Sequence, residues 1–335
     1  MFLRCAIATV LSLLGLPAAA QCTGDSYLDQ LSDRDQAALT ATVAAMPYAE
    51  GIIWTAQKDD RHITVVGTMH IYDPRLEPIH DGLRDTIAGA DLVLVEATPE
   101  DEIKLQNMVA ADPSRIFIIE GPSLRDLLDD DTWDLVVQAA QARNIPGFMA
   151  AKMQPWYLSM MLSIPVCASA ELMEGARGLD HMIMADAIAA RVPLQGLEPF
   201  TTLFDIFQND PIEDQIDMLM VSLLAPDQQQ QMFVATLDRY FAQDVGRLWE
   251  LSRFAMANIP GVTPAEAEAL FAETEAALLI DRNRNWMPVI ADAAARHDQL
   301  VIAVGAAHLI GTDGVLQLLE NDGWTLTRSA AYSSP

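Results

Sequence analysis

Two short segments near opposite ends of the chain share one pattern, in which a hydrophobic run is followed by Gly-x-x-His. The first segment runs from Gly67 to His70 and the second from Gly305 to His308. Glycine adopts backbone conformations that other residues avoid, so the chain can turn sharply where a buried strand ends. If the two strands are parallel, both histidines lie at the edge of the sheet where open α/β proteins bind ligands.

Two other hydrophobic runs end on a glutamate, so acids accompany the histidines. Glu96 follows residues 92–95 and Glu198 follows residues 192–197. Imidazole and carboxylate groups together suit Zn²⁺, Mn²⁺ or Co²⁺, and a metal ion in such a site activates water and polarises a carbonyl group. A remaining glutamate can act as a general base. The simpler alternative is that each of these side chains only forms a local hydrogen bond or caps a helix.

The segment from Asp281 to Trp286 holds two arginines, Arg282 and Arg284, in a chain with only 20 Lys and Arg residues. One interpretation is an exposed helix start that Asp281 caps. The functional interpretation is that Arg282 reaches the crevice and stabilises an oxyanion or a substrate carboxylate.

Other polar residues have ordinary structural interpretations. Asp180 follows Gly178-Leu179 and is expected to cap a helix rather than to be an acid of the site. The remaining histidines are expected on the surface or in the core: His62, His80, His181 and His297.

Hydrophobic periodicity predicts strands that alternate with helices. Strands are expected at 52–57, 62–66, 91–96, 192–198, 299–304 and 324–328. Helices are expected at 27–48, 77–89, 99–111, 123–143, 155–190 and 313–321, and residues 200–296 are helical almost throughout. This alternation is typical of an α/β fold with a mostly parallel central sheet that helices flank on both faces. We therefore expect one domain over residues 21–335, with a large all-helical cap at 200–296 before a final strand–helix–strand.

The amino terminus has the pattern of a secretory signal peptide, expected over residues 1–20. Arg4 precedes an apolar run at 6–16, and small residues at 17–20 suit a cleavage site. The run is shorter than the roughly 20 residues that a membrane-spanning helix needs. The mature protein is thus expected in the periplasm or outside the cell. A lipoprotein acylated at Cys22 is the less favoured alternative, because Gln21 is not the small residue that a lipobox requires.

Two cysteines, Cys22 and Cys167, remain after removal of the expected signal. In an exported protein such a pair can form a disulfide. The alternative is that Cys167 is a buried apolar residue.

The chain is strongly acidic, with 47 Asp and Glu residues and a net charge of −27. Nucleic acids and anionic membranes are therefore disfavoured as partners, because binding phosphates requires clusters of Lys and Arg. No stretch of the mature sequence has the length and hydrophobicity of a transmembrane helix. The expected partner is a peptide or a small-molecule substrate.

The chain resembles the TraB/GumN family, which also contains the animal Tiki proteases, over residues 51–328. The resemblance rests on several short segments: residues 66–70, Glu96, Gly178-Leu179-Asp180, Leu197-Glu198, Arg282-Asn283 and residues 304–311. The ending at 314–326 is also similar to the family's ending.

The resemblance implies a fold related to erythromycin esterase and to the ChaN haem-binding lipoproteins. It implies an active site of paired Gly-x-x-His motifs, two glutamates and an arginine. Carried over by motif, the site residues are His70, Glu96, Glu198, Arg282 and His308. We expect His70 and His308 to hold the metal ion with Glu96, or Glu198 in its place, as a further ligand, and the other glutamate to act as base while Arg282 stabilises negative charge. Tiki members are metal-dependent proteases that use manganese or cobalt, so the resemblance implies a metal-dependent hydrolase of peptide or related amide bonds.

Two other functions agree with the same residues. The relationship to erythromycin esterase implies a metal-free esterase in which a histidine is the base. The relationship to ChaN implies a protein that binds haem or another ligand, or an accessory protein of polymer export. Tiki proteins also carry a membrane anchor, whereas this sequence has no hydrophobic tail before Pro335.

Overall fold

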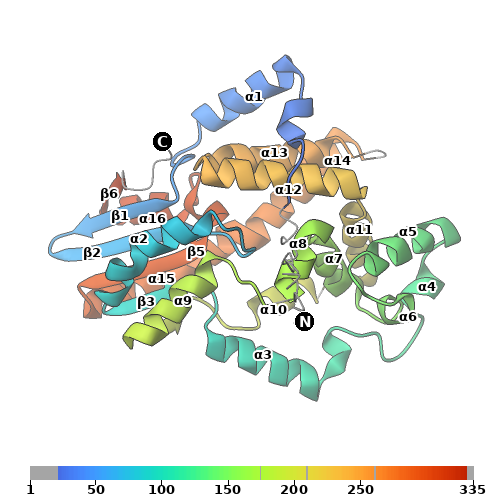
Figure 1. Cartoon of the computed structure of the whole chain (residues 1–335), viewed down its shortest axis with the longest axis horizontal. Coiled ribbons are helices and arrows are strands. Elements are labelled where there is room, and N and C mark those ends of the chain that lie inside the picture. Colours follow the sequence, from blue (N-terminus) through green and yellow to red (C-terminus); the bar gives the residue numbers. More distant parts are fainter. Residues whose placement is uncertain (1–21, 174, 209, 260–261, 330–335) are drawn as a thin grey trace, which may run out of the picture.

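A six-stranded mixed sheet forms the centre of the computed structural model, with strand order β4-β3-β5-β2-β1-β6 (Figure 1). The structure describes residues 22–329 apart from 174, 209 and 260–261, so the expected signal peptide lies outside the described residues. The strands are β1 (Ile53–Lys58), β2 (Arg61–Thr68), β3 (Leu92–Val95), β4 (Leu194–Gly196), β5 (Gln299–Gly305) and β6 (Thr325–Arg328).

Four neighbouring strands, β4, β3, β5 and β2, run parallel. Strand β5 lies between β3 and β2, and Thr68 at the end of β2 is opposite Gly305 at the end of β5. Strands β1 and β6 extend the sheet in antiparallel pairs. A tight turn with Asp59 at φ 55° joins β1 to β2 and sets the first of these pairings. The expected α/β fold is confirmed, and its six-stranded sheet is mixed, with the four parallel strands that a mostly parallel sheet requires.

Helices account for most of the remaining described chain. The larger ones are α1 (Asp33–Ala44), α2 (Leu76–Ala88), α3 (Pro99–Ala111), α5 (Asp130–Gln141), α7 (Pro155–Ser163), α8 (Val166–Met173), α9 (Leu179–Ala190), α11 (Ile212–Ser222), α12 (Pro226–Phe241), α13 (Val245–Ala257), α14 (Pro264–Glu275) and α15 (Asp281–Arg296). The shorter ones are η1 (Tyr27–Gln30), η2 (Pro113–Arg115), α4 (Leu124–Leu127), α6 (Gly147–Ala150), α10 (Thr202–Phe207), the π-helix η3 (Ala276–Ile280), η4 (Ala306–Leu309) and α16 (Val315–Asn321).

The sheet is covered on both faces. Helices α2 and α9 pack together on one face, and α15 and α16 pack together on the other (Figure 1). Strand β3 shows why this layering is required, since all four residues of Leu92–Val95 are buried and need apolar partners on both sides. The connections after β2 and β3 cross one face, whereas those after β4 and β5 cross the other. Such a reversal creates a ligand-binding crevice at the carboxyl ends of the strands.

Most of the other helices lie beyond these carboxyl ends, away from the turn between β1 and β2 (Figure 1). They come from two segments, α3 to α8 between β3 and β4, and α10 to η3 between β4 and β5. Helices α7 and α11 pack on each other around a second hydrophobic core that includes Leu158, Leu162 and Leu219. The expected helical stretch at 200–296 is present in its described residues, but its last helix, α15, belongs to the sheet layers. None of the helices described has both the length and the hydrophobicity to cross a bilayer.

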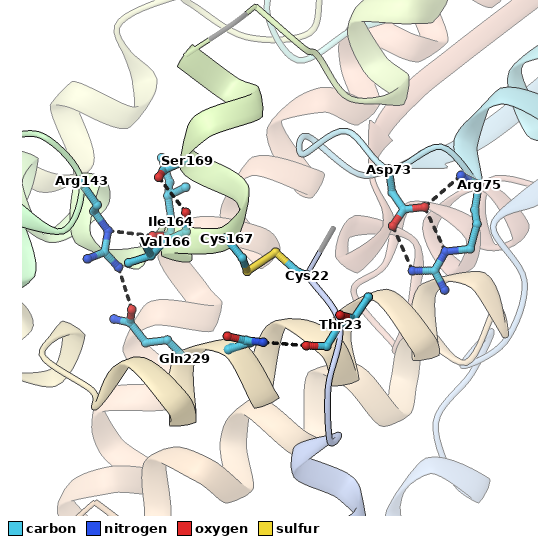
Figure 2. Close-up of a disulfide and its surroundings, with 11 residues drawn as sticks. Cys22, Thr23, Asp73, Arg75, Arg143, Ile164, Val166, Cys167, Ser169 and Gln229 are labelled. Carbon is cyan, nitrogen blue, oxygen red and sulfur yellow. Dashed lines mark hydrogen bonds and ion pairs between the residues drawn. A yellow bond between two sulfur atoms is a disulfide. The ribbon is translucent and has the colours of Figure 1, made fainter. Parts of the chain in front are cut away.

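A disulfide joins Cys22 to Cys167 on α8, across a sequence separation of 145 residues (Figure 2). The same amino-terminal segment is held on α12 by a hydrogen bond of 2.6 Å from Gln230 Nε2 to the carbonyl of Thr23. The pairing that the sequence allowed is therefore present. A sulfur atom in a disulfide cannot also carry a lipid thioether, and such a bond suits an oxidising compartment.

Loss of this disulfide should destabilise the protein, because the bond restricts the unfolded chain over a long loop. Cys167→Ala is expected to lower the free energy of unfolding by about 2–4 kcal/mol. Denaturant unfolding with and without a reductant measures the effect. The reductant should destabilise the wild type and leave Cys167→Ala unchanged, and equal unfolding of the oxidised and reduced wild type would contradict the bond.

Candidate functional site

The carboxyl ends of the four parallel strands bring together the residues that the sequence singled out. Across the sheet, Glu198 follows β4, Glu96 follows β3, His308 follows β5 and His70 follows β2. Because β5 and β2 are adjacent and parallel, the two Gly-x-x-His segments lie side by side. The order of the strands therefore places the two acids on one side of the site and the two histidines on the other.

The two motif glycines matter because they lack a side chain, and their backbone angles are ordinary. This corrects the expectation that glycine is needed here for its conformational freedom. Gly67 lies within β2, and Gly305 ends β5 with φ −50°. A Cβ on Gly67 would lie 2.8 Å from Leu309 Cδ1 and 3.0 Å from Ala306 Cα. Because Gly67 lacks this atom, helix η4 of the second motif can pack directly on β2.

Gly305 has a different role, because its missing side chain leaves room in the site itself. A Cβ there would lie 3.4 Å from Glu96 Oε1, 3.6 Å from His308 Cδ2 and 3.7 Å from His70 Nε2. These are ordinary van der Waals distances, so the three functional side chains surround the same small space. The backbone N–H of Gly305 also donates to Glu96 Oε1 at 2.7 Å.

Arg282 is the cation at the centre of the site. Its Nη2 donates to Glu96 and to Glu198, both at 2.6 Å, and its Nε donates to Glu198 at 3.0 Å. Its Nη1 donates to the carbonyl of Leu278 at 3.1 Å and faces His308 Nε2 at 3.2 Å. All five N–H groups of a guanidinium are then used. A substrate oxyanion would have to replace one of these acceptors.

The sequence places Arg282 here through a local irregularity in its helix. The preceding segment, Ala276–Ile280, is a π-helix, and such turns often occur at functional sites. The carbonyl of Leu278 in this segment accepts from Nη1 of Arg282. One turn later, Trp286 donates its indole N–H to Glu198 Oε2 at 3.0 Å, and the guanidinium lies 5.0 Å from the Trp286 ring centre. Helix α15 thus supplies both the cation and a second donor for Glu198.

His308 is buried, with 4% of its surface exposed, and both ring nitrogens have partners. Asn283 donates its amide to the Asp313 carbonyl at 2.9 Å, which turns its oxygen toward His308 Nδ1 at 2.7 Å. Nδ1 therefore carries the proton, and the Nε2 lone pair accepts from Arg282. Burial lowers the pKa of His308 to about 3, and the charge of Arg282 acts in the same direction. His308 is neutral at physiological pH.

His70 differs from His308, since 63% of its side chain is exposed. Its Nδ1 lies 3.1 Å from Asp180 Oδ2, and within the described residues Nε2 has no hydrogen-bond partner. Partial removal from water lowers the pKa of His70, but the hydrogen bond and charge of Asp180, with the charge of Glu96, raise it to about 9. For Glu96, burial raises the pKa, but the neighbouring imidazoles, Arg282 and the Gly305 N–H bring it to about 2.

The donor types at this site suit a divalent transition metal. His308 also has its second nitrogen fixed by an amide, which is the usual support of a metal-binding imidazole. In the described part of the chain, however, no three His, Cys, Asp or Glu residues are already arranged as a metal site. Arg282 instead forms hydrogen bonds with Glu96 Oε2 and His308 Nε2, the atoms that would bind the ion. The residues therefore fit a metal ion in chemistry, and Arg282 competes with it for two of the three ligands.

The structure brings all five predicted residues to one place: His70, Glu96, Glu198, Arg282 and His308. The expectation that Asp180 caps a helix is wrong, because Gly178 is the N-cap of α9 and Asp180 lies in its first turn facing His70. His181, expected to be an ordinary surface or core residue, contacts Asp180 at 3.1 Å. Asn283 and Trp286 were missed as contributors, although the spacing from Arg282 puts them on neighbouring faces of one helix turn.

Fold and site together define an α/β protein whose candidate active site lies at the carboxyl edge of a mostly parallel sheet. A family model for the TraB/PrgY/gumN family matches residues 52–328, so the chain belongs to this family. Comparison with curated proteins and with solved structures found no significant match.

The two motif glycines should respond differently to alanine. Gly67→Ala is expected to destabilise the fold by about 1–3 kcal/mol, because its methyl group would overlap η4. Gly305→Ala has room and an ordinary φ, so its unfolding free energy should change by less than about 1 kcal/mol. Its methyl group would nevertheless fill the space between the site residues, so binding of Mn²⁺, Co²⁺ or Zn²⁺ at this site is expected to weaken by about 100-fold. Denaturant unfolding and binding titrations on both variants give the comparison, and unchanged binding by Gly305→Ala would contradict it.

Neighbouring arginines provide a second comparison. Arg282→Met leaves the largely buried Glu96 and Glu198 without their shared guanidinium partner, so we expect a loss of about 3–5 kcal/mol in unfolding free energy. Arg284→Met removes an exposed ion pair with Asp313, for which the cost is about 0–1 kcal/mol. Equal thermal stability of the two variants would show that Arg282 does not hold the acids together.

Proposed function

We propose that the protein is an exported hydrolase that cleaves a peptide or related amide bond with the help of a divalent metal ion. The observation that carries the proposal is the convergence of His70, Glu96 and His308 around Gly305 at the sheet edge. Membership of the TraB/PrgY/gumN family and the oxidised cysteine pair support it. Mn²⁺, Co²⁺ and Zn²⁺ are the candidate ions, and periplasmic or secreted location follows from the expected signal peptide.

His70, Glu96 and His308 would hold the metal ion. When bound, such an ion activates water and polarises the scissile carbonyl group. Asn283 and Gly305 hold two of these ligands in position. Asn283 keeps the Nε2 lone pair of His308 directed inward, and the Gly305 N–H holds one Glu96 oxygen in place.

Glu198 anchors Arg282 rather than facing the substrate, because both of its oxygens accept hydrogen bonds from Arg282 or Trp286. Arg282 in turn offsets the charge of the two acids before a metal ion or substrate arrives. When the Nη2–Glu96 contact is released, the same N–H group can donate to negative charge that develops on the substrate. This assigns Glu96 to the reaction and Glu198 to the support of Arg282.

A metal-free hydrolase is the second candidate, favoured by the contacts of His308. Since both nitrogens of His308 are engaged, His70 Nε2 is left to face the crevice. In its neutral form His70 would take the proton from a water molecule that attacks the carbonyl carbon, and the leaving group would then receive that proton.

Removal and return of metal ions test the proposal. Purified mature protein should bind Mn²⁺, Co²⁺ or Zn²⁺, lose turnover on a peptide library after chelation and regain it when the ion is restored. His70→Ala and His308→Ala should each weaken binding by about 10–100-fold or more, since even the partners of ligands contribute that much. His62→Ala, at the other end of β2, is the matched control. Because the proton on His70 competes with the metal, affinity should rise as pH increases toward about 9.

Three outcomes decide between the candidates. Metal binding that both histidine variants weaken supports the metal-dependent enzyme. Turnover that survives full chelation and is lost in His70→Ala supports the metal-free hydrolase. A wild type that binds no metal and turns over no peptide or ester would overturn both.

A further inference from the structure

A chain of alternating acids and imidazoles leads away from the site on the side of His70. Asp180 Oδ2 lies 3.1 Å from His70 Nδ1 and 3.1 Å from His181 Nδ1. His181 Nε2 in turn lies 2.8 Å from Glu102 Oε1 on α3. One carboxylate oxygen is therefore shared by two imidazoles, and the second imidazole is held from its far side by another acid.

The backbone of α9 holds the same turn that Asp180 contacts. Gly178 donates its N–H to the carbonyl of His70 at 3.1 Å, and Leu179 donates to the carbonyl of Met69 at 3.0 Å. A Cβ on Gly178 would lie 2.0 Å from the Met69 carbonyl oxygen, so only glycine allows this approach. The start of α9 is thus fixed against the His70 turn at two points, and Asp180 follows directly.

The position of Asp180 in the helix also suits its charge. It lies in the first turn of α9, where the unpaired N–H groups of the helix favour an anion. Hydrogen bonds from His181 and His70 outweigh burial and lower the pKa of Asp180, while Asp180 raises the pKa of His181. The carboxylate thus accepts from His70 Nδ1 and lies in ion-pair contact with His181 Nδ1.

We propose that Asp180 is the positioning residue of His70, and that His181 and Glu102 fix the Asp180 carboxylate in the orientation this requires. An accepting carboxylate at Nδ1 keeps the proton on that nitrogen, so Nε2 of the neutral ring is the free nitrogen directed at the space beside Gly305. The same geometry serves a metal ligand and a general base, since either needs the Nε2 lone pair. The inference rests on the proposed function only in giving His70 such a role.

The chain offers a matched control on the same helix. Asp186 of α9 lies 2.8 Å from His80 Nε2 of α2, an Asp–His ion pair away from the site. Replacing either aspartate with asparagine removes one charge from α9 and weakens its contacts with histidine, of which Asp180 has two and Asp186 has one. Effects on folding should therefore be alike, whereas only Asp180 should influence His70.

The first test is spectroscopic and needs neither metal nor substrate. In protein with ¹⁵N-labelled histidine, the wild type should give a low-field Nδ1–H signal that His70→Ala removes. Asp180→Asn should remove or shift this signal, because an amide can donate to Nδ1 and reverse the tautomer. Asp186→Asn should leave it in place. A wild type without the signal, or an Asp180→Asn variant that keeps it, would overturn the proposal.

The second test measures Mn²⁺ affinity on the same proteins. Asp180→Asn should weaken binding by about 10–100-fold, as loss of a partner behind a ligand does. His181→Gln should produce a smaller loss, because Asp180 then lacks one of its two donors, and Asp186→Asn should bind as the wild type does. An equal loss in Asp186→Asn would assign the effect to folding, and unchanged binding by His181→Gln would end the chain at Asp180. If the wild type binds no metal, the proposed metal chemistry fails while the histidine signal still decides the positioning role.

Discussion

The structure around the candidate site depends on one buried guanidinium that holds two carboxylates together. Glu96 and Glu198 end adjacent parallel strands, so the sheet brings two negative charges to one edge whether or not a ligand is present. Arg282 compensates them with its planar arrangement of donors, which a lysine could not reproduce. Any metal ion or substrate must therefore exchange with a cation that the protein already carries.

The histidines of the two Gly-x-x-His motifs have different surroundings, although both motifs follow the same pattern. His308 is enclosed between Asn283 and Arg282, and burial lowers its pKa, whereas His70 is exposed and Asp180 raises its pKa. The difference arises because α15 packs against His308, whereas α9 packs against His70. The site thus joins a buried half around His308 to a more accessible half around His70.

The two helices that complete the site are those that cover the sheet, α9 on one face and α15 on the other. Each approaches the carboxyl edge with its amino-terminal turn, where Asp180 and Arg282 lie. A π-helix directly precedes α15, and Gly178 lets the start of α9 lie close to the Met69 carbonyl. Helices from the two long insertions lie beyond the same edge, and the disulfide at Cys167 ties the amino-terminal segment to one of them.

The sequence by itself determined the strand ends and therefore the four residues they carry, His70, Glu96, Glu198 and His308, because hydrophobic runs followed by Gly or Glu are local patterns. It also determined α2, α3 and α16 to within two residues, whereas the range expected as one helix at 123–143 holds two, α4 and α5. It did not determine the order of the strands, the partner of each histidine or the pairing of Arg282, since these depend on contacts between residues far apart in the chain. Asp180 is the clearest case: one local pattern suits both a helix cap and a site acid, and only the packing of α9 against the His70 turn decides between them.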